Sequence, residues 1–358
     1  MSFLNRWFSD KDRDEKVSPQ LVNKILETMR ESVIVVGEDT RILSSNRAAY
    51  DAFARKNGAL AGKRLSEVIR DLTLHEAFRK ALAENKSSDI ELEIPLEHRK
   101  FDVHIAPIQI GETKGAIGVF YDITQIERLE TVRQEFLSNI SHELRTPLTS
   151  ILAFVETLED GAIRDEANNQ HFLGVIRRNA ERMHRLIDDI LELSTIESGK
   201  IALNIKKINL SRLVTEIFTN LSGKANERRI KFINEIAEDV YVSADAVRLE
   251  QMLTNLIDNA VKFNRDGGKV VVRHKQNAVG NNVISVADTG EGISNEHLQR
   301  IFERFYRTDR ARSREIGGTG LGLAIVKHLA RLHEGEVSVA SNIGEGTTFL
   351  LELPVKPV

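Results

Sequence analysis

The chain has 358 residues, 41% of them hydrophobic and 29% charged, with a formal net charge of −3 and no cysteine. This composition is ordinary for a globular protein of about two to three domains, and its balanced charge does not favour nucleic-acid binding. The absence of cysteine excludes disulfides, thiolate nucleophiles and zinc–thiolate sites, and it favours a reducing compartment.

No apolar run approaches the ~18 residues that a membrane span needs, so the sequence predicts no transmembrane segment in this chain. Residues 1–20 carry the apolar side chains Phe3, Leu4, Trp7 and Phe8, followed by a charged run. We interpret them as an N-terminal tail, because the apolar stretch is too short for a signal peptide.

Residues 21–124 are predicted to form the first domain. Apolar or alternating segments bounded by turn residues predict strands at 33–36, 41–45, 90–94, 101–110 and 115–121. Between Asn46 and Glu84 the apolar spacing is helical instead. Together these patterns predict a small antiparallel sheet with short helices on one side.

Residues 125–200 are predicted to form two long helices joined by a loop near Gly161. Residues of the second helix repeat at spacings of four and three, which is a heptad seam: Phe172, Ile176, Asn179, Met183, Leu186, Ile190 and Leu193. Two such helices form an antiparallel hairpin and two hairpins make a four-helix bundle, so the pattern predicts a homodimer. We interpret Asn179 as a polar residue that sets the register of the seam.

The first helix of this hairpin carries a histidine on its polar side. His142 lies about 140–180° around the helix from the apolar stripe, which consists of Leu137, Ile140, Leu144, Leu148 and Ile151. A single exposed histidine is usually an ordinary surface residue, but its neighbours favour chemistry here. Glu143 can hydrogen-bond one ring nitrogen, and Thr146 lies one turn further on the same face. Pro147 has no N–H, so the helix is expected to bend beside His142.

Residues 207–358 are predicted to form a third domain in which helices and strands are mixed. The patterns predict helices at 210–226, 244–261 and 321–333, and strands at 270–274, 283–287, 336–339 and 347–353. Nine of the 22 glycines lie between Gly290 and Gly346. Such clustering suggests loops whose backbone approaches a ligand closely.

The stretch from His142 to Leu148, with the sequence HELRTPL, resembles the H box of bacterial two-component sensor histidine kinases. This resemblance implies that His142 accepts a phosphoryl group on a ring nitrogen and that Glu143 acts as the base. It also implies that Thr146 serves the reverse, phosphatase reaction.

Further segments resemble the nucleotide-binding boxes of the same family, in the family's order. The residues that carry this resemblance are Asn255, Asn259, Lys262 and Phe263; Asp288, Gly290 and Gly292; Tyr306 and Arg307; Gly318, Thr319, Gly320, Leu321, Gly322 and Leu323; and Thr347. The resemblance implies that they bind ATP, that Asn259 is the Mg²⁺ ligand and that Asp288 binds the adenine amine. Amide oxygens suit Mg²⁺, and Lys262 suits a phosphate. Phe263 stands where a tyrosine is commonest in the family.

Six arginines precede the Gly318 loop, and a solvated basic face is the usual interpretation of such a run. They are Arg300, Arg304, Arg307, Arg310, Arg312 and Arg314. Because they directly precede the predicted phosphate loop, we predict a mobile lid that clamps the triphosphate.

The first domain resembles a PAS sensor domain, whose common exit into a signalling helix is similar to the segment 121–124. The order of domains most resembles phosphate-regulon sensor kinases, which usually carry membrane helices before the PAS domain. The predicted fold is therefore a multidomain α+β chain. It comprises a PAS-type α/β domain, a helical hairpin that forms a dimeric four-helix bundle, and an α/β-sandwich ATP-binding domain of the GHKL type.

The function that the resemblance implies is ATP-dependent phosphorylation of His142, transfer to an aspartate of a response regulator, and dephosphorylation of that regulator. A role in phosphate-starvation signalling follows from the subtype, and an unknown ligand or signal protein is expected for the PAS domain. The alternatives are a GHKL-type ATPase and a catalytically inactive PAS-containing scaffold. The expected location is the cytoplasm, at the inner membrane if the chain belongs to a longer membrane kinase.

Overall fold

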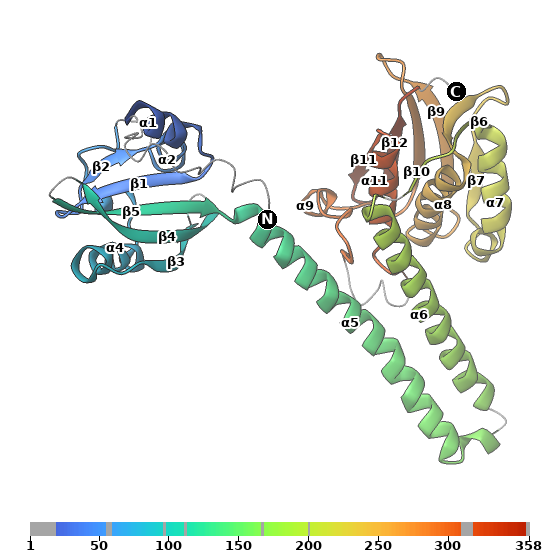
Figure 1. Ribbon diagram of the computed structural model, residues 1–358. Coiled ribbons are helices and arrows are strands. Elements are labelled where there is room, and N and C mark those ends of the chain that lie inside the picture. The colour runs from blue at the N-terminus through green and yellow to red at the C-terminus, as the bar shows by residue number, and fades with distance from the viewer. Residues whose placement is uncertain are drawn as a thin grey trace, which may run out of the picture. The chain divides into compact units, whose positions relative to one another are not determined.

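The computed structural model describes residues 19–54, 59–95, 98–110, 113–165, 168–199, 201–308 and 318–355. Nearly all of the predicted N-terminal tail lies outside the described residues, as do three predicted lid arginines, Arg310, Arg312 and Arg314. The chain divides into two compact units, Met1–Gln134 and Glu135–Val358. We call them the N-terminal unit and the C-terminal unit, and both are drawn as ribbons in Figure 1. Each unit has its own hydrophobic core.

The N-terminal unit is built on a five-stranded antiparallel sheet with the strand order β2-β1-β5-β4-β3. Its strands are β1 (Ser32–Gly37), β2 (Ile42–Ser45), β3 (Ser88–Ile94), β4 (Arg99–Ile110) and β5 (Thr113–Asp122). Its helices are α1 (Pro19–Thr28), α2 (Arg47–Phe53), α3 (Leu65–Val68) and α4 (Leu72–Glu84). All five predicted strands are present, whereas α1 was not among the predicted elements.

The core of this unit is filled by aromatic side chains, because the inward faces of β4 and β5 carry phenylalanine. The ring centroids of Phe53 lie 5.2 Å from Phe101 and 5.1 Å from Phe120. Phe78 of α4 is fully buried beside Gly118 of β5, where a Cβ atom would lie 2.6 Å from the Phe78 ring. These closely packed rings fill the interior of the unit.

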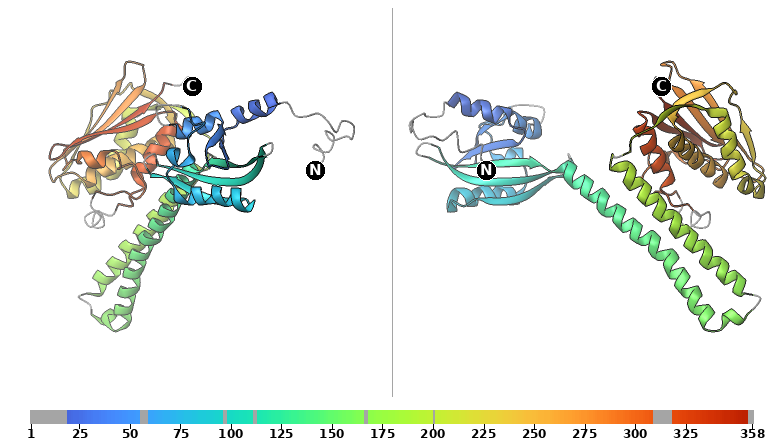
Figure 2. Two further views of the ribbon diagram at one scale, coloured as in Figure 1. Left: turned by 90° about the vertical axis from the view of Figure 1, so that its left-hand side faces the viewer. Right: turned by 45° about the vertical axis from the view of Figure 1, so that its right-hand side comes forward.

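The C-terminal unit begins with the helical hairpin, formed by α5 (Thr124–Glu159) from Glu135 onward and α6 (Asn169–Glu197). The two helices run antiparallel, joined through the 3₁₀ turn η2 (Ala162–Arg164) (Figures 1 and 2). The Asn179 amide nitrogen of α6 donates to Ser150 of α5 over 3.3 Å. This contact agrees with a role for Asn179 in fixing the register of the helices.

The remainder of the unit, which we call the C-terminal module, is an α/β sandwich. Its main sheet has the order β11-β12-β10-β9-β7, in which only the β7–β9 pair is parallel, and β6 and β8 form a second, two-stranded sheet. The strands are β6 (Ile205–Asn209), β7 (Lys231–Asn234), β8 (Tyr241–Asp245), β9 (Lys269–Gln276), β10 (Asn282–Asp288), β11 (Glu336–Asn342) and β12 (Gly346–Leu353). The helices are α7 (Leu210–Glu227), α8 (Ala246–Lys262), α9 (Asn295–Leu298) and α11 (Gly322–Leu332).

Helices α7, α8 and α11 lie side by side on one face of the main sheet (Figure 1). They do so because each has one continuous apolar face; in α8 it is formed by Leu249, Met252, Leu253, Leu256, Ile257, Ala260 and Val261, all buried. The opposite face of α8 stays polar, and it carries the predicted nucleotide-binding amides. No helix in the described part of the chain is long and apolar enough to cross a membrane.

Candidate functional site

His142 lies on an exposed face of α5. The face that packs on the core of the C-terminal module carries Phe136, Ile140 and Leu144, and His142 lies about 160° around the helix from Leu144. Among the described residues, no hydrogen bond or ion pair reaches the His142 ring. The ring is therefore accessible, but it faces away from the module that packs on its own helix.

Glu143 does not contact the His142 ring as expected. Its Oε2 atom accepts hydrogen bonds from Arg182 of α6 at 3.0 Å and from Arg307 of the C-terminal module at 3.1 Å. The reason is geometric, because consecutive side chains on a helix point about 100° apart. Glu143 thus faces the module while His142 faces outward. The side chains of Arg307 and Arg182 are 6% and 14% exposed, so Glu143 is held in a largely buried cluster of charges.

Thr146 lies on the same face of α5 as His142, and its hydroxyl donates to the His142 carbonyl oxygen over 3.2 Å. The next residue is Pro147, which is buried inside the continuous helix and cannot donate to the Glu143 carbonyl. The Thr146 hydroxyl thus adds a hydrogen bond to the backbone next to the one that Pro147 cannot make. A rotation about its side-chain bond would release that hydroxyl toward the His142 face.

The polar face of α8 carries Asn255, Asn259 and Lys262. The Asn255 amide lies against the start of α11, with its nitrogen 3.4 Å from the Gly322 carbonyl oxygen. The half-buried Asn259 amide makes no hydrogen bond within the part of the chain that the structure describes. Asn259 is therefore available as a ligand.

Lys262 is held by a carboxylate of its own helix. Its Nζ atom lies 2.5 Å from Asp258, which also binds Lys224 at 2.8 Å. Burial alone would raise the pKa of Asp258, but the charges and hydrogen bonds of Lys262 and Lys224 lower it below its usual value. Asp258 is therefore an ionised anchor that positions the Lys262 ammonium group.

Asp288 ends β10 at the point where three loops meet. Its carboxylate accepts hydrogen bonds from the backbone N–H of Gly290 at 2.8 Å and of Thr347 at 3.2 Å. Burial raises the pKa of Asp288, and these two hydrogen bonds lower it in part. The loops are tightly apposed, because a Cβ atom at Gly290 would lie 2.2 Å from the carbonyl oxygen of Phe263. Phe263 itself is 47% exposed, as a ring that stacks on a ligand would be.

The loop from Gly318 to Leu321 leads into α11. At Gly320 the backbone angle φ is +76°, which favours glycine, and a Cβ atom would lie 2.9 Å from Phe305. The hydroxyl of Thr319 does not point to solvent but donates to Asp189 of α6 over 2.6 Å. This loop is thus joined directly to the hairpin.

The segment before the predicted lid also contacts its surroundings through specific bonds. The Tyr306 hydroxyl lies 2.7 Å from His297 Nδ1, and the Arg300 guanidinium lies 4.4 Å from the Tyr306 ring centroid. Arg304 contacts Glu197 of α6 and stacks on Phe136 of α5. Among the described lid arginines, Arg304 and Arg307 therefore bind carboxylates of the hairpin.

Sequence reasoning missed Arg228, which follows α7. Its guanidinium donates to the carbonyl oxygens of Val261 at 2.8 Å, Lys262 at 2.6 Å and Asn264 at 2.6 Å. It therefore caps the C-terminal end of α8, where backbone carbonyls lack helical donors. A lone arginine carries no sequence signal for such a contact, because the partner lies more than thirty residues away.

Sequence reasoning also missed Asp189 of α6. It was not predicted because the heptad spacing assigns its apolar neighbours to the seam. Asp189 is then one of several polar residues outside the seam. Burial raises the pKa of Asp189, and the hydrogen bond from Thr319 and the charge of Lys262 oppose this rise. Asp189 thus lies among residues that were predicted to bind phosphate.

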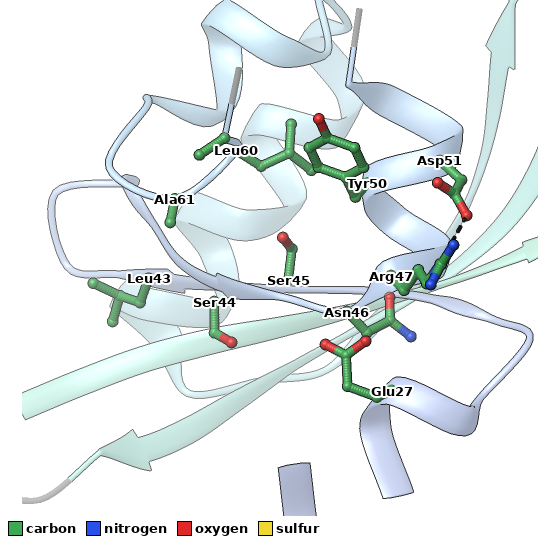
Figure 3. A pocket seen from close by; sticks show the side chains of 11 residues that line it. Glu27, Leu43, Ser44, Ser45, Asn46, Arg47, Tyr50, Asp51, Leu60 and Ala61 are labelled. Atoms are coloured by element: carbon green, nitrogen blue, oxygen red, sulfur yellow. Dashed lines mark ion pairs between the residues drawn. The ribbon is translucent and has the colours of Figure 1, made fainter. Parts of the chain in front are cut away.

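The N-terminal unit has an open surface cavity of about 500 Å³ between α1, α2 and β2 (Figure 3). Its wall includes Ser44, Ser45 and Tyr50, with the Arg47–Asp51 ion pair at one side. At its base the buried Asn46 side chain bonds the backbone of α1, β1 and α2. The cavity lies outside the aromatic core of the unit.

Three family models match the chain in succession. They are the PAS fold at residues 26–128, the His Kinase A (phospho-acceptor) domain at 132–199, and the histidine kinase-, DNA gyrase B-, and HSP90-like ATPase at 244–357. The predicted combination of a PAS-type domain, a helical hairpin and a GHKL-type module is therefore confirmed.

Curated relatives include the sensor histidine kinase WalK of Bacillus subtilis (strain 168). It is 33% identical over 339 residues, which cover 93% of this chain and 55% of the relative. A sensor protein kinase WalK of Staphylococcus aureus is 33% identical over 345 residues, which cover 94% of this chain and 81% of the relative. The chain spans about half the length of the Bacillus relative.

Among solved structures, the histidine kinase ThkA in complex with the response regulator protein TrrA is similar. It has a TM-score of 0.52 and 24% identity, covering 93% of this chain and 98% of that chain. The histidine kinase AdeS of Acinetobacter baumannii has a TM-score of 0.50 and 24% identity, covering 60% of this chain and 98% of that chain. At these identities the likeness supports the fold.

Proposed function

Because the chain belongs to the sensor histidine kinases, we propose that it is an ATP-dependent protein-histidine kinase of a two-component system. It phosphorylates His142 and passes the phosphoryl group to an aspartate of a response regulator. The observation that carries this proposal is the exposed His142 on a helix that packs on a module with tightly apposed glycine loops. ATP is the phosphoryl donor that this module is built to bind.

In the proposed reaction a ring nitrogen of His142 attacks the γ-phosphorus of ATP, and the bond to the bridging oxygen breaks to release ADP. Glu143 accepts the proton of the ring and holds the imidazole in one orientation. In the arrangement described here Glu143 is held by Arg182 and Arg307. This role therefore requires that Arg182 and Arg307 both release the Glu143 carboxylate and that it turns toward the ring before transfer.

The nucleotide site is proposed to lie between α8 and the loops that follow β10 and precede α11. Asp288 binds the adenine amine, Phe263 stacks on the base, and the N–H groups near Gly318 and Gly322 face the phosphates. Further members of the site are Gly290, Gly292, Tyr306, Thr319, Gly320, Leu321, Leu323 and Thr347. Both backbone hydrogen bonds to the half-buried Asp288 reach the same oxygen, Oδ1, which supports its role as a base-binding carboxylate.

Mg²⁺ is proposed to bind at Asn259. Within the described residues there is no cluster of three or more histidine or acidic side chains that could hold a metal ion. The unbonded amide of Asn259 fits a Mg²⁺ ion that also takes water and phosphate ligands. When bound, Mg²⁺ would neutralise charge on the transferring phosphoryl group. Lys262, anchored by Asp258, supplies a second positive charge at the same face of α8.

The chain is proposed to act as a homodimer through its hairpin. Apolar side chains of the hairpin, which are exposed in one copy, are Leu137, Leu148 and Leu152 on α5 from Glu135 onward and Leu173, Ile187 and Leu191 on α6. A second hairpin would cover them in a four-helix bundle. Because His142 faces away from the module on its own helix, transfer requires either rotation of that module or the module of the second copy.

Thr146 is proposed to serve the phosphatase reaction toward the regulator, by orienting a water molecule near His142. Its position one turn from His142 on the exposed face supports this role. Replacing Thr146 by alanine should slow dephosphorylation of the regulator and leave phosphorylation of His142 intact. An unchanged phosphatase rate would exclude this role.

We propose the divisions 21–124, 125–200 and 207–358 for the sensor domain, the hairpin and the ATP-binding domain. A phosphate-starvation role rests on domain order alone, and the relatives described above carry the name WalK. The PAS ligand or signal protein stays open, and location in the cytoplasm or at the inner membrane stays a prediction.

The experiment that tests the proposed function compares the full chain with His142→Gln. With γ-labelled ATP and Mg²⁺, the wild-type chain should gain an acid-labile label, and the variant should gain none while it still binds ATP. Label on histidine in the variant would refute the site. A chain that hydrolyses ATP without labelling would favour the GHKL-type ATPase, and one that binds no ATP would favour the inactive scaffold.

A further inference from the structure

The hairpin contacts the C-terminal module through acidic side chains on one face of α6. We call Asp189, Glu192 and Glu197 the acidic row. Asp189 accepts from Thr319 at 2.6 Å, Glu192 binds Arg248 at 2.6 Å, and Glu197 binds both Arg304 and His328. Arginines thus face Glu192 and Glu197, whereas Asp189 faces a neutral hydroxyl group.

The contacts of the acidic row fall into two kinds. Arg248 and His328 have no proposed role in binding nucleotide, so their pairs with Glu192 and Glu197 join the two parts. Arg304, which also pairs with Glu197, belongs to the predicted lid. Thr319, in contrast, belongs to the proposed phosphate loop. The Glu143 contact on α5 resembles the Asp189 contact, since its partner Arg307 also belongs to the proposed nucleotide site.

A hydroxyl group has one proton to donate. While Thr319 donates to Asp189 it cannot donate to a phosphate oxygen. The Arg307 guanidinium has further N–H groups, but the Nη2 hydrogen that is directed at Glu143 is not available to a phosphate. A carboxylate at this position also repels a triphosphate, and the repulsion is strong in a partly buried site. The Asp189 carboxyl is half-buried, and the charge of Lys262, a second proposed phosphate ligand, opposes the rise of its pKa that burial causes.

We propose that Asp189, assisted by Glu143, takes the place of nucleotide phosphate at the module's phosphate-binding groups, so that docking on the hairpin and binding of ATP oppose each other. This inference rests on the proposed function. Coupling of this kind is reciprocal. The contact between the module and α6 weakens nucleotide binding by some factor, and bound nucleotide weakens that contact by the same factor. The same event separates Arg307 from Glu143, which keeps Arg182 of α6 as its partner.

The test measures the affinity of the full chain for a non-hydrolysable ATP analogue with Mg²⁺, by titration calorimetry. Asp189→Asn removes the charge and keeps the size of the side chain. We expect this variant to bind the analogue about fivefold or more tightly than the wild-type chain, a typical size for coupling between sites. Adenosine, which has no phosphate, should bind the two chains equally.

Two matched variants separate this competition from other effects. Asp188→Asn makes the same change one residue earlier, at an exposed side chain that pairs with His184 at 2.7 Å, and its affinity should equal that of the wild type. Glu192→Gln weakens docking without touching a proposed phosphate ligand, so it should tighten analogue binding less than Asp189→Asn does. Equal tightening by both would refute competition at the phosphate groups and leave only general docking.

A second readout follows hydrogen exchange of the α6 backbone. The analogue should speed exchange around Asp189 and Glu192 in the wild-type chain, and adenosine should not. If the wild-type chain binds the analogue and Asp189→Asn binds it equally or more weakly, this inference is wrong, whereas the proposed function stands. If the wild-type chain binds no analogue, the proposed function fails, and this inference fails with it.

Discussion

Gly118 in the N-terminal unit and Gly290 in the C-terminal module both leave no room for a methyl group, but their neighbours differ. A Cβ atom at Gly118 would lie 2.6 Å from a ring carbon of Phe78, which is a side chain of the core. At Gly290 the nearest atom is the backbone carbonyl oxygen of Phe263, at 2.2 Å. The first glycine makes room for an aromatic ring, and the second lets two loops meet.

Two other glycines near Gly290 also lie against backbone atoms. In the C-terminal module a Cβ atom at Gly346 would lie 2.1 Å from the Asp288 carbonyl oxygen, and one at Gly292 would lie 2.0 Å from that of Asn342. Close approach of backbones around a buried carboxylate is suited to ligand binding, whereas a filled aromatic interior is suited to stability.

The largest expected effect is on the aromatic core. Phe120 is 1% exposed, so Phe120→Ala should destabilise the N-terminal unit by about 3–5 kcal/mol. Hydrogen exchange of the full chain would measure the loss strand by strand. Affinity of the C-terminal module for an ATP analogue should stay unchanged, since the two cores are separate. A matching loss of affinity would show that the two units are not independent.

The second effect concerns the loops around Asp288. Gly290→Ala forces the Gly290 and Phe263 backbones apart, so affinity for the ATP analogue should fall by about tenfold or more, or about 1.4 kcal/mol. Gly223→Ala is the matched control, because Gly223 is an exposed residue of α7 with no atom within 4 Å of the added methyl. That control should bind normally and be slightly more stable. Normal binding by Gly290→Ala would contradict the proposed position of the site.

Arg228 offers a smaller effect on the same site. Arg228→Ala removes three hydrogen bonds to the end of α8 and should cost about 1–3 kcal/mol of stability. It should also weaken analogue binding several-fold, because Lys262 and Phe263 lie at that end. Arg228→Lys should recover only part of the affinity, since one ammonium cannot reproduce the fork of a guanidinium. If Arg228→Ala is less stable but binds the analogue with unchanged affinity, Arg228 stabilises the fold and does not contribute to the site.

The smallest effect is a dependence of stability on pH. The pKa of Asp258 is lowered, so its charge contributes stability that is present above the ordinary aspartate value of about 3.9 and lost as pH falls through the lowered value. Asp258→Asn should therefore be about 1–2 kcal/mol less stable than wild type at pH 7. Urea unfolding should show this difference shrinking below about pH 4. A difference that grows on acidification would contradict the role of Lys262 and Lys224.

Elements with strong periodicity were predictable from the sequence. The heptad seam predicted α6, and the Asn179 contact with Ser150 agrees with the role that its place in the seam suggested. The short strands β6, β7 and β8 were missed, because four or five residues carry too little pattern. Their pairing is fixed by distant partners, as in the parallel pairing of β7 with β9. The ten-residue helix α1 was missed as well.

The candidate site shows the same division. The candidate nucleotide-binding residues on α8 and in the glycine loops could be identified from the sequence, because each group lies within one short segment. The contacts of Glu143, Thr319 and Arg228 were not readable, because each joins segments more than thirty residues apart. The expected contact of Glu143 with the His142 ring was wrong for that reason, since a distant arginine outcompetes a neighbour that points elsewhere.

The measurement that tests the central claim most directly is the position of phosphate on the full chain after incubation with ATP and Mg²⁺. Peptides should be prepared and mapped at alkaline pH, where phosphohistidine survives. The account predicts one acid-labile phosphate on the peptide that contains His142, and its loss when a cognate response regulator is added. Phosphate at another residue, or none on a chain that binds ATP, would contradict it.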